Sequence, residues 1–354
     1  MGNYLKFDYR QFNRENLTRI LSRFGPPEKP KILYISTYRP DYTRTESLLQ
    51  LFAEVGLQVR TVLTGGSRLR YVNAVRDLLR HRAWCDLVFV AFRGQETLPI
   101  VRMFAGKPIV FDALVSIYDT MCFDREVFEP DSLPGRCLKA YDRWLCRMSS
   151  VVLVDTHVHQ QYFQSEFRAT NIEYLYVGCN DKLFKPTPAE RDESMTTVLW
   201  YGTSNPLQGV DIMLRAAKLL EGEPVRFRLA GPIRRRYAGL LDELNLTNTE
   251  VVDFLPYRQL PAEIHKADIC LGGHFSDKDK AKRVIAGKTF EFLACGKPTI
   301  VGDNPASREL FTEGDLVHFV EMNSPRSLAE KIRQLRRKQM DASHAEACQN
   351  NHVC

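Results

Sequence analysis

Short apolar runs of strand length alternate with amphipathic helical segments along most of this chain. In the first half, runs rich in Val, Ile, Leu and Phe occur at residues 31–37, 58–66, 86–92, 107–113 and 150–155. Helical periodicity follows each of the first four runs, and the last of these helical regions extends to Arg147. This alternation is typical of a parallel sheet with helices on both faces.

The alternation pauses at residues 177–195, which are polar and contain two prolines, and starts again at Thr196. The pause predicts a linker between two domains. We therefore predict an α/β fold of two doubly wound, Rossmann-like domains that face each other across a deep cleft, where ligands of such domains bind. The predicted divisions are an N-terminal extension (1–30), a first domain (31–180), a linker (181–195), a second domain (196–338) and a tail (339–354).

The two chain ends differ from the predicted domains. Apolar residues between positions 17 and 24 fall on one helical face, and Gly25, Pro26 and Pro27 end that helix. Because its charges are mixed, a helix packed on the first domain explains the pattern better than a membrane-surface anchor. The last residues are polar and predict a disordered tail.

Composition excludes several classes of protein. The 354 residues are 44% hydrophobic and 26% charged, which excludes disordered and fibrous chains, and the longest apolar runs are too short to cross a bilayer. The nine cysteines have no CxxC spacing, which favours reduced thiols over disulfides or zinc. A net charge of +6 fits a nucleotide, another anionic small molecule or an acidic membrane surface, and it does not require nucleic acid. We expect a cytoplasmic protein, with the inner face of a membrane as a further location compatible with this charge.

The segment 280–310 carries the densest candidate chemistry. A helix N-terminus offers free N–H groups to phosphate, and Glu291 lies in the first turn of a helix predicted to start near Thr289. Its carboxylate could accept hydrogen bonds from both hydroxyls of a ribose. The alternative is a solvated basic loop, with Glu291 favouring only the helix dipole. Four basic residues lead into this helix: Lys280, Lys282, Arg283 and Lys288.

Other polar residues stand at predicted strand ends, each with a structural alternative. Asp112 ends the run 107–113 and could contact a sugar or take a proton from an acceptor, or it could cap a turn. Asp119 and Asp124 are better explained as solvated helix acids. His157 and His159 lack the further ligands of a metal site. We predict no metal site and no cofactor.

Four stretches of the second half resemble the family-four glycosyltransferases, retaining enzymes of the GT-B fold. They are YGTSNPLQGVDIMLRAAKLL (201–220), FRLAGP (227–232), VVDFLPYRQLPAEIHKADICL (251–271) and KTFEFLACGKPTIVGDNPASREL (288–310). KILYIST, GKPIVFDA and VVLVDTHVH stand at the expected places in the first half.

The resemblance implies metal-independent transfer of a sugar, hexosyl or related, from a nucleotide-sugar donor with retention of configuration. The acceptor would be a glycan, a lipid-linked sugar or a small molecule, in cell-surface polysaccharide or glycolipid synthesis. It implies that the first domain binds the acceptor, that the second binds the donor and that Glu291 holds the ribose. It also implies nucleotide contacts by position: Gly202, Thr203, Gln208, Gly231, Pro256, Tyr257, Gly287 and Thr289.

The chain departs from the family at three positions. The family has a glutamate that contacts the donor sugar eight residues before Glu291, where this chain has Arg283. It often has an arginine and a lysine at the positions of Thr203 and Gln208. We therefore predict that Arg283 and Lys288 neutralise the phosphates and, with Asp112, form the catalytic set. Two alternatives stay open: a nucleotide-sugar epimerase or hydrolase on the same fold, and a catalytically silent nucleotide-binding scaffold subunit.

Overall fold

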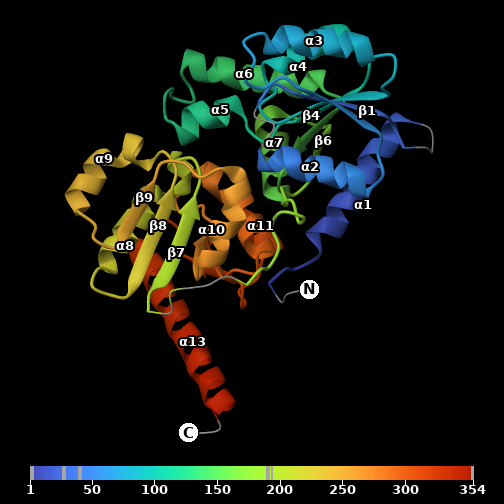
Figure 1. Cartoon of the computed structure of the whole chain (residues 1–354). Coiled ribbons are helices and arrows are strands. Elements are labelled where there is room, and N and C mark those ends of the chain that lie inside the picture. The colour runs from blue at the N-terminus through green and yellow to red at the C-terminus, as the bar shows by residue number, and fades with distance from the viewer. Residues whose placement is uncertain (1–3, 26–28, 39–41, 189–191, 193, 352–354) are drawn as a thin grey trace. The chain divides into compact units, whose positions relative to one another are not determined.

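The computed structural model describes residues 4–25, 29–38, 42–188, 192 and 194–351. By their contacts these residues divide into two compact units (Figure 1). Unit 1 comprises Leu5–Asn180 together with Lys278–Gly287, and unit 2 comprises Tyr4, Asp181–Asp277 and the described residues from Lys288 onward.

Unit 1 is built around a six-stranded parallel sheet in the order β2-β1-β3-β4-β5-β6. Its central strands are buried along their whole length, as expected for a parallel sheet covered on both faces. The strands are β1 (Ile32–Ser36), β2 (Val59–Leu63), β3 (Leu87–Val90), β4 (Ile109–Asp112), β5 (Val151–Val154) and β6 (Ile172–Tyr174).

Helices cover both faces of this sheet. One apolar core lies under α3 (Arg70–His81), α4 (Thr97–Ala105), α6 (Leu133–Met148) and α7 (His157–Phe167). The other lies under α1 (Tyr9–Leu21) and α2 (Thr43–Glu54). A short helix α5 (Ile117–Asp119) and the π-helical turn Thr120–Asp124 follow β4. The prediction that the N-terminal helix packs on the first domain is confirmed.

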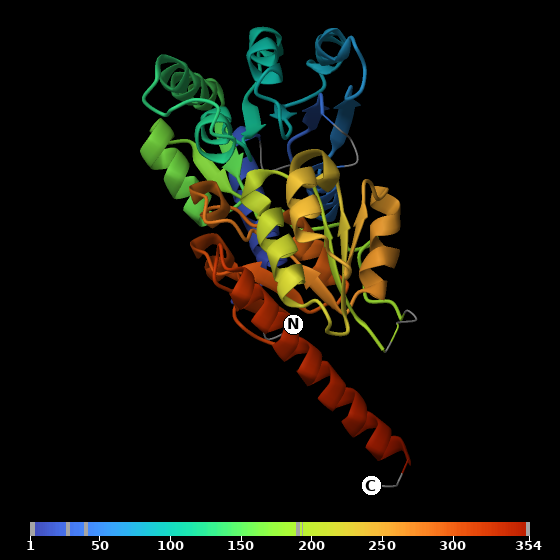
Figure 2. The same cartoon turned by 90° about the vertical axis from the view of Figure 1, so that its left-hand side faces the viewer.

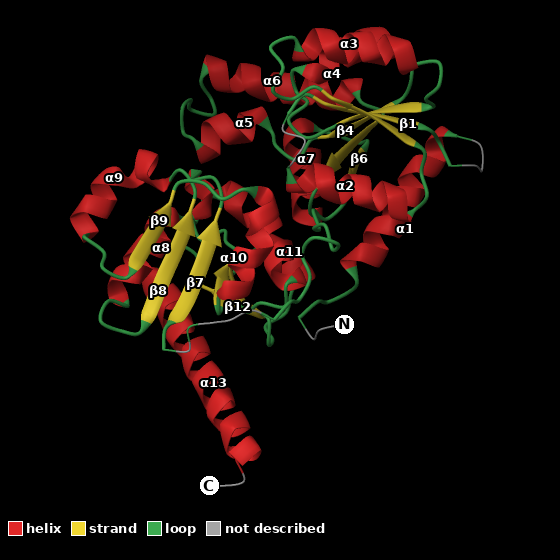
Figure 3. Ribbon diagram, in the orientation of Figure 1, coloured by secondary structure: helices red, strands yellow, loops and turns green. Residues whose placement is uncertain are grey.

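Unit 2 repeats the architecture with the sheet order β12-β11-β10-β7-β8-β9, again with all described pairings parallel (Figure 3). The strands are β7 (Thr196–Tyr201), β8 (Val225–Ala230), β9 (Thr249–Val252), β10 (Ile269–Leu271), β11 (Thr299–Gly302) and β12 (Val317–Val320). The helices are α8 (Val210–Leu219), α9 (Ile233–Leu244), α10 (Leu260–Lys266), α11 (Gly287–Ala294), α12 (Pro305–Leu310) and α13 (Pro325–Asn351).

The structure differs from the sequence-based prediction in three segments. Helix α7 and strand β6 occupy a stretch for which the sequence analysis predicted no helix and no strand. The predicted disordered tail is wrong as far as Asn351, because α13 continues through it (Figure 2). Leu328 and Ile332 anchor the first turns of α13 in the core, and the Ala, Gln and Glu residues that follow have high helix propensity.

The third difference concerns the segment Lys278–Gly287. It lies inside the second domain as predicted from the sequence, yet its contacts assign it to unit 1. The chain therefore leaves unit 2 after Asp277 and returns at Lys288. No helix in the described ranges is both long and apolar enough to traverse a bilayer.

Candidate functional site

Glycines let backbone segments approach closely at the carboxyl ends of the strands in unit 2. A Cβ on Gly231, after β8, would lie 2.0 Å from the carbonyl oxygen of Gly202, after β7. A Cβ on Gly272, after β10, would lie 2.7 Å from Thr289 Oγ1 on α11. No larger residue fits at these positions, so the backbone segments pack closely at the edge of the sheet where ligands of doubly wound folds bind.

Lys288 is a buried ammonium at this end of the sheet. Its Nζ donates to Gln208 Oε1 at 2.6 Å and lies 5.4 Å from the centre of the Trp200 ring. Its side chain forms no ion pair with a carboxylate among the residues that the structure describes. Burial lowers the pKa of Lys288 to about 7, against an opposing effect of the Glu291 carboxylate. A buried cation without an anionic partner is costly, and a bound anion would relieve that cost.

Glu291 lies one turn further along α11 and is also buried. The hydroxyl of Tyr201, the last residue of β7, donates to Glu291 Oε2. Burial and the neighbouring carboxylate raise the pKa of Tyr201 well above its usual value, so the phenol stays a donor. This bond orients the carboxylate. The sequence analysis predicted Glu291 but missed Tyr201, because a tyrosine at the end of a strand has the pattern of a core residue.

Thr289 completes the first turn of α11. Its side chain is fully buried, and its Oγ1 has no hydrogen-bond partner in the described part of the chain. Together with Lys288 and Gln208, the structure thus gathers a cation, an amide and an unsatisfied hydroxyl within unit 2. Two predicted nucleotide contacts therefore lie beside the predicted catalytic Lys288: Gln208 accepts its hydrogen bond, and Thr289 follows it in the chain.

Other predicted contacts are more peripheral. Thr203 and Pro256 are exposed, and Tyr257 packs edge-on against Phe184 with ring centres 5.6 Å apart. Gly287 opens α11, but its contacts belong to unit 1.

Arg283 belongs to unit 1, whereas Lys288 belongs to unit 2. Its guanidinium pairs with Asp119 at 2.5 Å and lies 3.9 Å from the centre of the Tyr162 ring. Its carbonyl oxygen accepts a hydrogen bond from Thr156. Lys280 also docks on unit 1, where its Nζ donates to Thr120 Oγ1 at 2.8 Å. The predicted basic loop is therefore divided between the two units, and the charge of Arg283 is already matched by a carboxylate.

Asp119 and Asp124 are buried, so the prediction that they are solvated helix acids is wrong. Asp119 is the anchor of Arg283, and one of its oxygens, Oδ2, has no hydrogen-bond partner among the described residues. The short elements after β4 turn both carboxylates inward, which helical periodicity alone could not reveal.

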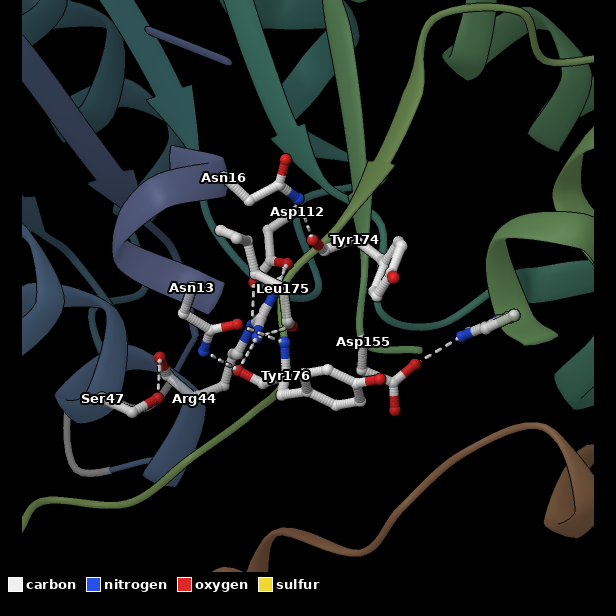
Figure 4. A network of polar contacts seen from close by, with 10 residues as sticks. Asn13, Asn16, Arg44, Ser47, Asp112, Asp155, Tyr174, Leu175 and Tyr176 are labelled. Carbon is white, nitrogen blue, oxygen red and sulfur yellow. Dashed lines mark hydrogen bonds and ion pairs between the residues drawn. The ribbon is translucent and has the colours of Figure 1, made fainter. Parts of the chain in front are cut away.

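Asp112 is part of a buried ion pair and is fully inaccessible to solvent. Arg44 Nη2 donates to its Oδ1 at 2.9 Å, and Arg44 Nε lies 3.2 Å from its Oδ2 (Figure 4). Arg44 Nη1 donates to the carbonyl of Leu175 at 2.8 Å. This geometry favours a structural role for Asp112 over the predicted catalytic one. Arg44 was missed, although it stands four residues before the buried Leu48 on the apolar face of α2.

The N-terminal helix is tied to the same network. Asn13 Nδ2 donates to the carbonyl of Tyr176 at 2.9 Å, and Asn16 Nδ2 donates to that of Tyr174 at 2.8 Å (Figure 4). Nearby, His159 Nδ1 lies 2.7 Å from Asp155 Oδ1, and both side chains are buried. His157 is exposed, and the described residues contain no cluster of three or more His, Cys, Asp or Glu side chains suited to a metal ion.

Residues 211–354 match the model of a family described as glycosyl transferase-like. A search of curated proteins found no match.

Solved structures show the same fold. Anabaena Alr3699/HepE in complex with UDP and glucose matches with a TM-score of 0.62 at 17% identity, over 86% of this chain and 89% of that one. Sucrose-phosphate synthase from Thermosynechococcus elongatus matches with a TM-score of 0.66 at 14% identity, over 87% and 90%. A putative UDP-N-acetylglucosamine 2-epimerase from Listeria monocytogenes matches with a TM-score of 0.51 at 12% identity, over 87% and 88%. The chain has the two-domain, Rossmann-like GT-B fold of glycosyltransferases, as predicted.

Proposed function

We propose that this protein is a glycosyltransferase that takes its sugar from a uridine diphosphate donor bound to unit 2. The observation that carries the proposal is the buried Lys288 ammonium, which has no carboxylate partner among the described residues and lies at the start of α11. A diphosphate supplies the missing negative charge, and free N–H groups at a helix start favour the same ligand.

The choice of uridine rests on the structural neighbours. HepE has been solved with UDP and with UDP-glucose, and these complexes share the fold of this chain. Glu291 is well suited to the ribose, since the hydroxyl of Tyr201 at the end of β7 orients its carboxylate.

Lys288 would then act on the leaving group. Cleavage of the bond between the anomeric carbon and the diphosphate leaves the electron pair on phosphate oxygen. The acceptor hydroxyl oxygen forms the new bond to that carbon and gives its proton to the released diphosphate. A fixed ammonium beside that oxygen stabilises the charge that develops in the transition state. Gln208, where the resembled family often has a lysine, holds Lys288 in place of a second cation.

The finer parts of the proposal rest on the resemblance to family-four enzymes. They are retention of anomeric configuration, independence of a metal ion, and a role in cell-surface glycan or glycolipid synthesis. In this proposal Arg283 positions other residues and does not act on the leaving group, because its guanidinium is engaged by Asp119.

Calorimetry with UDP, GDP, ADP and dTDP tests the donor class. UDP should bind at least tenfold more tightly than the other three, which corresponds to about 1.4 kcal/mol. Equal affinity for all four would remove uridine from the proposal, and no binding would remove the donor site itself.

A specific neighbour favours a second candidate function, the epimerase. Incubation of UDP-N-acetylglucosamine with the protein, without acceptor, separates the two. An epimerase converts the sugar under these conditions, whereas a transferase needs an acceptor and a silent subunit binds UDP without turnover.

A further inference from the structure

Three helices of unit 1 present apolar side chains to solvent. Helix α3 contacts α4, and α4 contacts α6, and both views show the three side by side (Figures 1 and 2). Their inner sides fill the core. On their outer sides Val72 is 62% exposed, Met103 77% and Trp144 46%. Isolated exposed apolar residues are ordinary, but one on each of three adjacent helices makes a shared surface.

Arginines surround these apolar residues. Residues three, four and seven apart lie on the same side of a helix, so Val72, Arg76 and Leu79 point outward together on α3. Arg80 follows at the edge of that side, and Arg102 neighbours Met103 on α4. We call the surface formed by Val72, Leu79, Arg80, Arg102, Met103 and Trp144 the outer face of unit 1.

The region around these helices is basic. Residues 68–107 contain eight Lys or Arg and three Asp or Glu, a net charge of +5.

The three carboxylates of this region are engaged locally. Glu96 pairs with Arg70, Asp77 pairs with Arg76, and Asp86 accepts a hydrogen bond from the backbone of Lys31. Arg80 and Arg102 form no ion pair within the described ranges. Their charges are therefore available to an external anionic surface.

We propose that the outer face of unit 1 docks on a lipid bilayer that contains anionic lipids. A bilayer matches both properties of the face, because headgroups attract the arginines while the interfacial region accepts apolar tips. A nucleic acid or an acidic protein surface would satisfy the charge but leave Val72 and Met103 against polar groups. The proposal is independent of the nucleotide site, since none of its residues belongs to unit 2.

Vesicle co-sedimentation of the full chain tests this docking. Vesicles of phosphatidylcholine mixed with phosphatidylglycerol should retain the protein at about 0.1 M salt, and vesicles of phosphatidylcholine alone should not. Binding should weaken as salt rises. Equal binding to both kinds of vesicle, or to neither, would overturn the proposal.

Two variant pairs separate the charge from the apolar contribution. Arg80→Glu with Arg102→Glu should lower binding to the mixed vesicles at least tenfold, and Val72→Ser with Met103→Ser severalfold. The matched control is Arg235→Glu with Arg236→Glu on α9, two exposed arginines of unit 2. Loss of binding in the control and not in the first pair would move docking to α9 and contradict the proposal.

Intrinsic fluorescence gives a readout that does not depend on pelleting. Of the three tryptophans, Trp200 is fully buried and Trp144 is exposed on the outer face. Mixed vesicles should shift the emission to shorter wavelength, and Trp144→Phe should abolish that shift while sedimentation persists. A shift that survives in Trp144→Phe would show that this face does not enter the interface. UDP affinity should be unchanged in every variant, which confirms that the variants are folded.

Discussion

Two buried cations, Arg44 of unit 1 and Lys288 of unit 2, have different partners. In unit 1 the guanidinium of Arg44 is matched by the Asp112 carboxylate. In unit 2 the ammonium of Lys288 donates to the neutral amide of Gln208 and forms no ion pair with a carboxylate among the described residues. Because an unmatched buried charge is destabilising, it persists where a ligand supplies its partner. Under the proposed function, the Arg44–Asp112 pair stabilises the fold, whereas Lys288 binds the donor.

Breaking the matched pair of unit 1 should have the largest effect. Arg44→Met leaves the Asp112 carboxylate buried without a cation and should lower the free energy of unfolding by about 3–5 kcal/mol. Urea unfolding followed by circular dichroism measures this.

The double variant Arg44→Met with Asp112→Leu serves as its control, since it removes both charges and should recover most of the loss. If Asp112→Asn abolished sugar transfer in a protein of unchanged stability and UDP affinity, the catalytic role of Asp112 would be restored.

The unmatched cation of unit 2 should behave in the opposite way. Lys288→Met removes a charge-assisted contact to diphosphate, so UDP affinity should fall by about 1.5–3 kcal/mol, while stability stays constant or rises. Calorimetry and urea unfolding of the same preparation give both quantities. Lys218→Met, which removes an exposed lysine of α8, is the matched control and should change neither. A large loss of stability in Lys288→Met would mean that the lysine serves the fold.

Loss of the ribose contact should lower UDP affinity somewhat less than loss of the Lys288 ammonium. Glu291→Ala should weaken UDP binding at least tenfold, about 1.4 kcal/mol, because the diol loses its acceptor. Tyr201→Phe keeps the carboxylate but frees its orientation, so its effect should be smaller. Unchanged UDP affinity in Glu291→Ala would exclude the ribose assignment, and a larger effect for Tyr201→Phe would make the phenol the direct contact.

A pH series should give the smallest changes in stability and UDP affinity, and it tests the role of the Lys288 ammonium directly. The pKa of Lys288 is about 7 in the folded protein, against about 10.4 for an unfolded chain. Between these values the unfolded chain holds a proton that the folded one lacks, so stability should rise with pH, by up to about 1.4 kcal/mol per unit.

UDP affinity should fall over the same range, since binding needs the ammonium, by up to about tenfold per unit. Calorimetry and urea unfolding between about pH 7 and pH 9 measure the two trends. Both should disappear in Lys288→Met. If affinity and stability changed in the same direction, another group would control the titration.

Much of the fold was predictable because its signal is local. Strand-length apolar runs and helical periodicity depend on residues within a few positions of one another, and they located β1 to β5 of unit 1 and the two-domain arrangement. The prediction failed where local polarity misled, as in α13, whose tail has helix-forming residues but few apolar ones. Glu291 and Lys288 were found because the order of loop, helix and carboxylate lies within one short segment.

The sequence by itself therefore determined the α/β class and the two-domain arrangement, and it predicted a site on α11. Only the tertiary structure decided which charges are matched. Arg44 and Asp112 are 68 positions apart, and Arg283 and Asp119 are 164 positions apart. The segment Lys278–Gly287 belongs to unit 1 only through such contacts. Pairing across such distances depends on how the elements pack, and packing is a property of the whole chain that no local pattern contains.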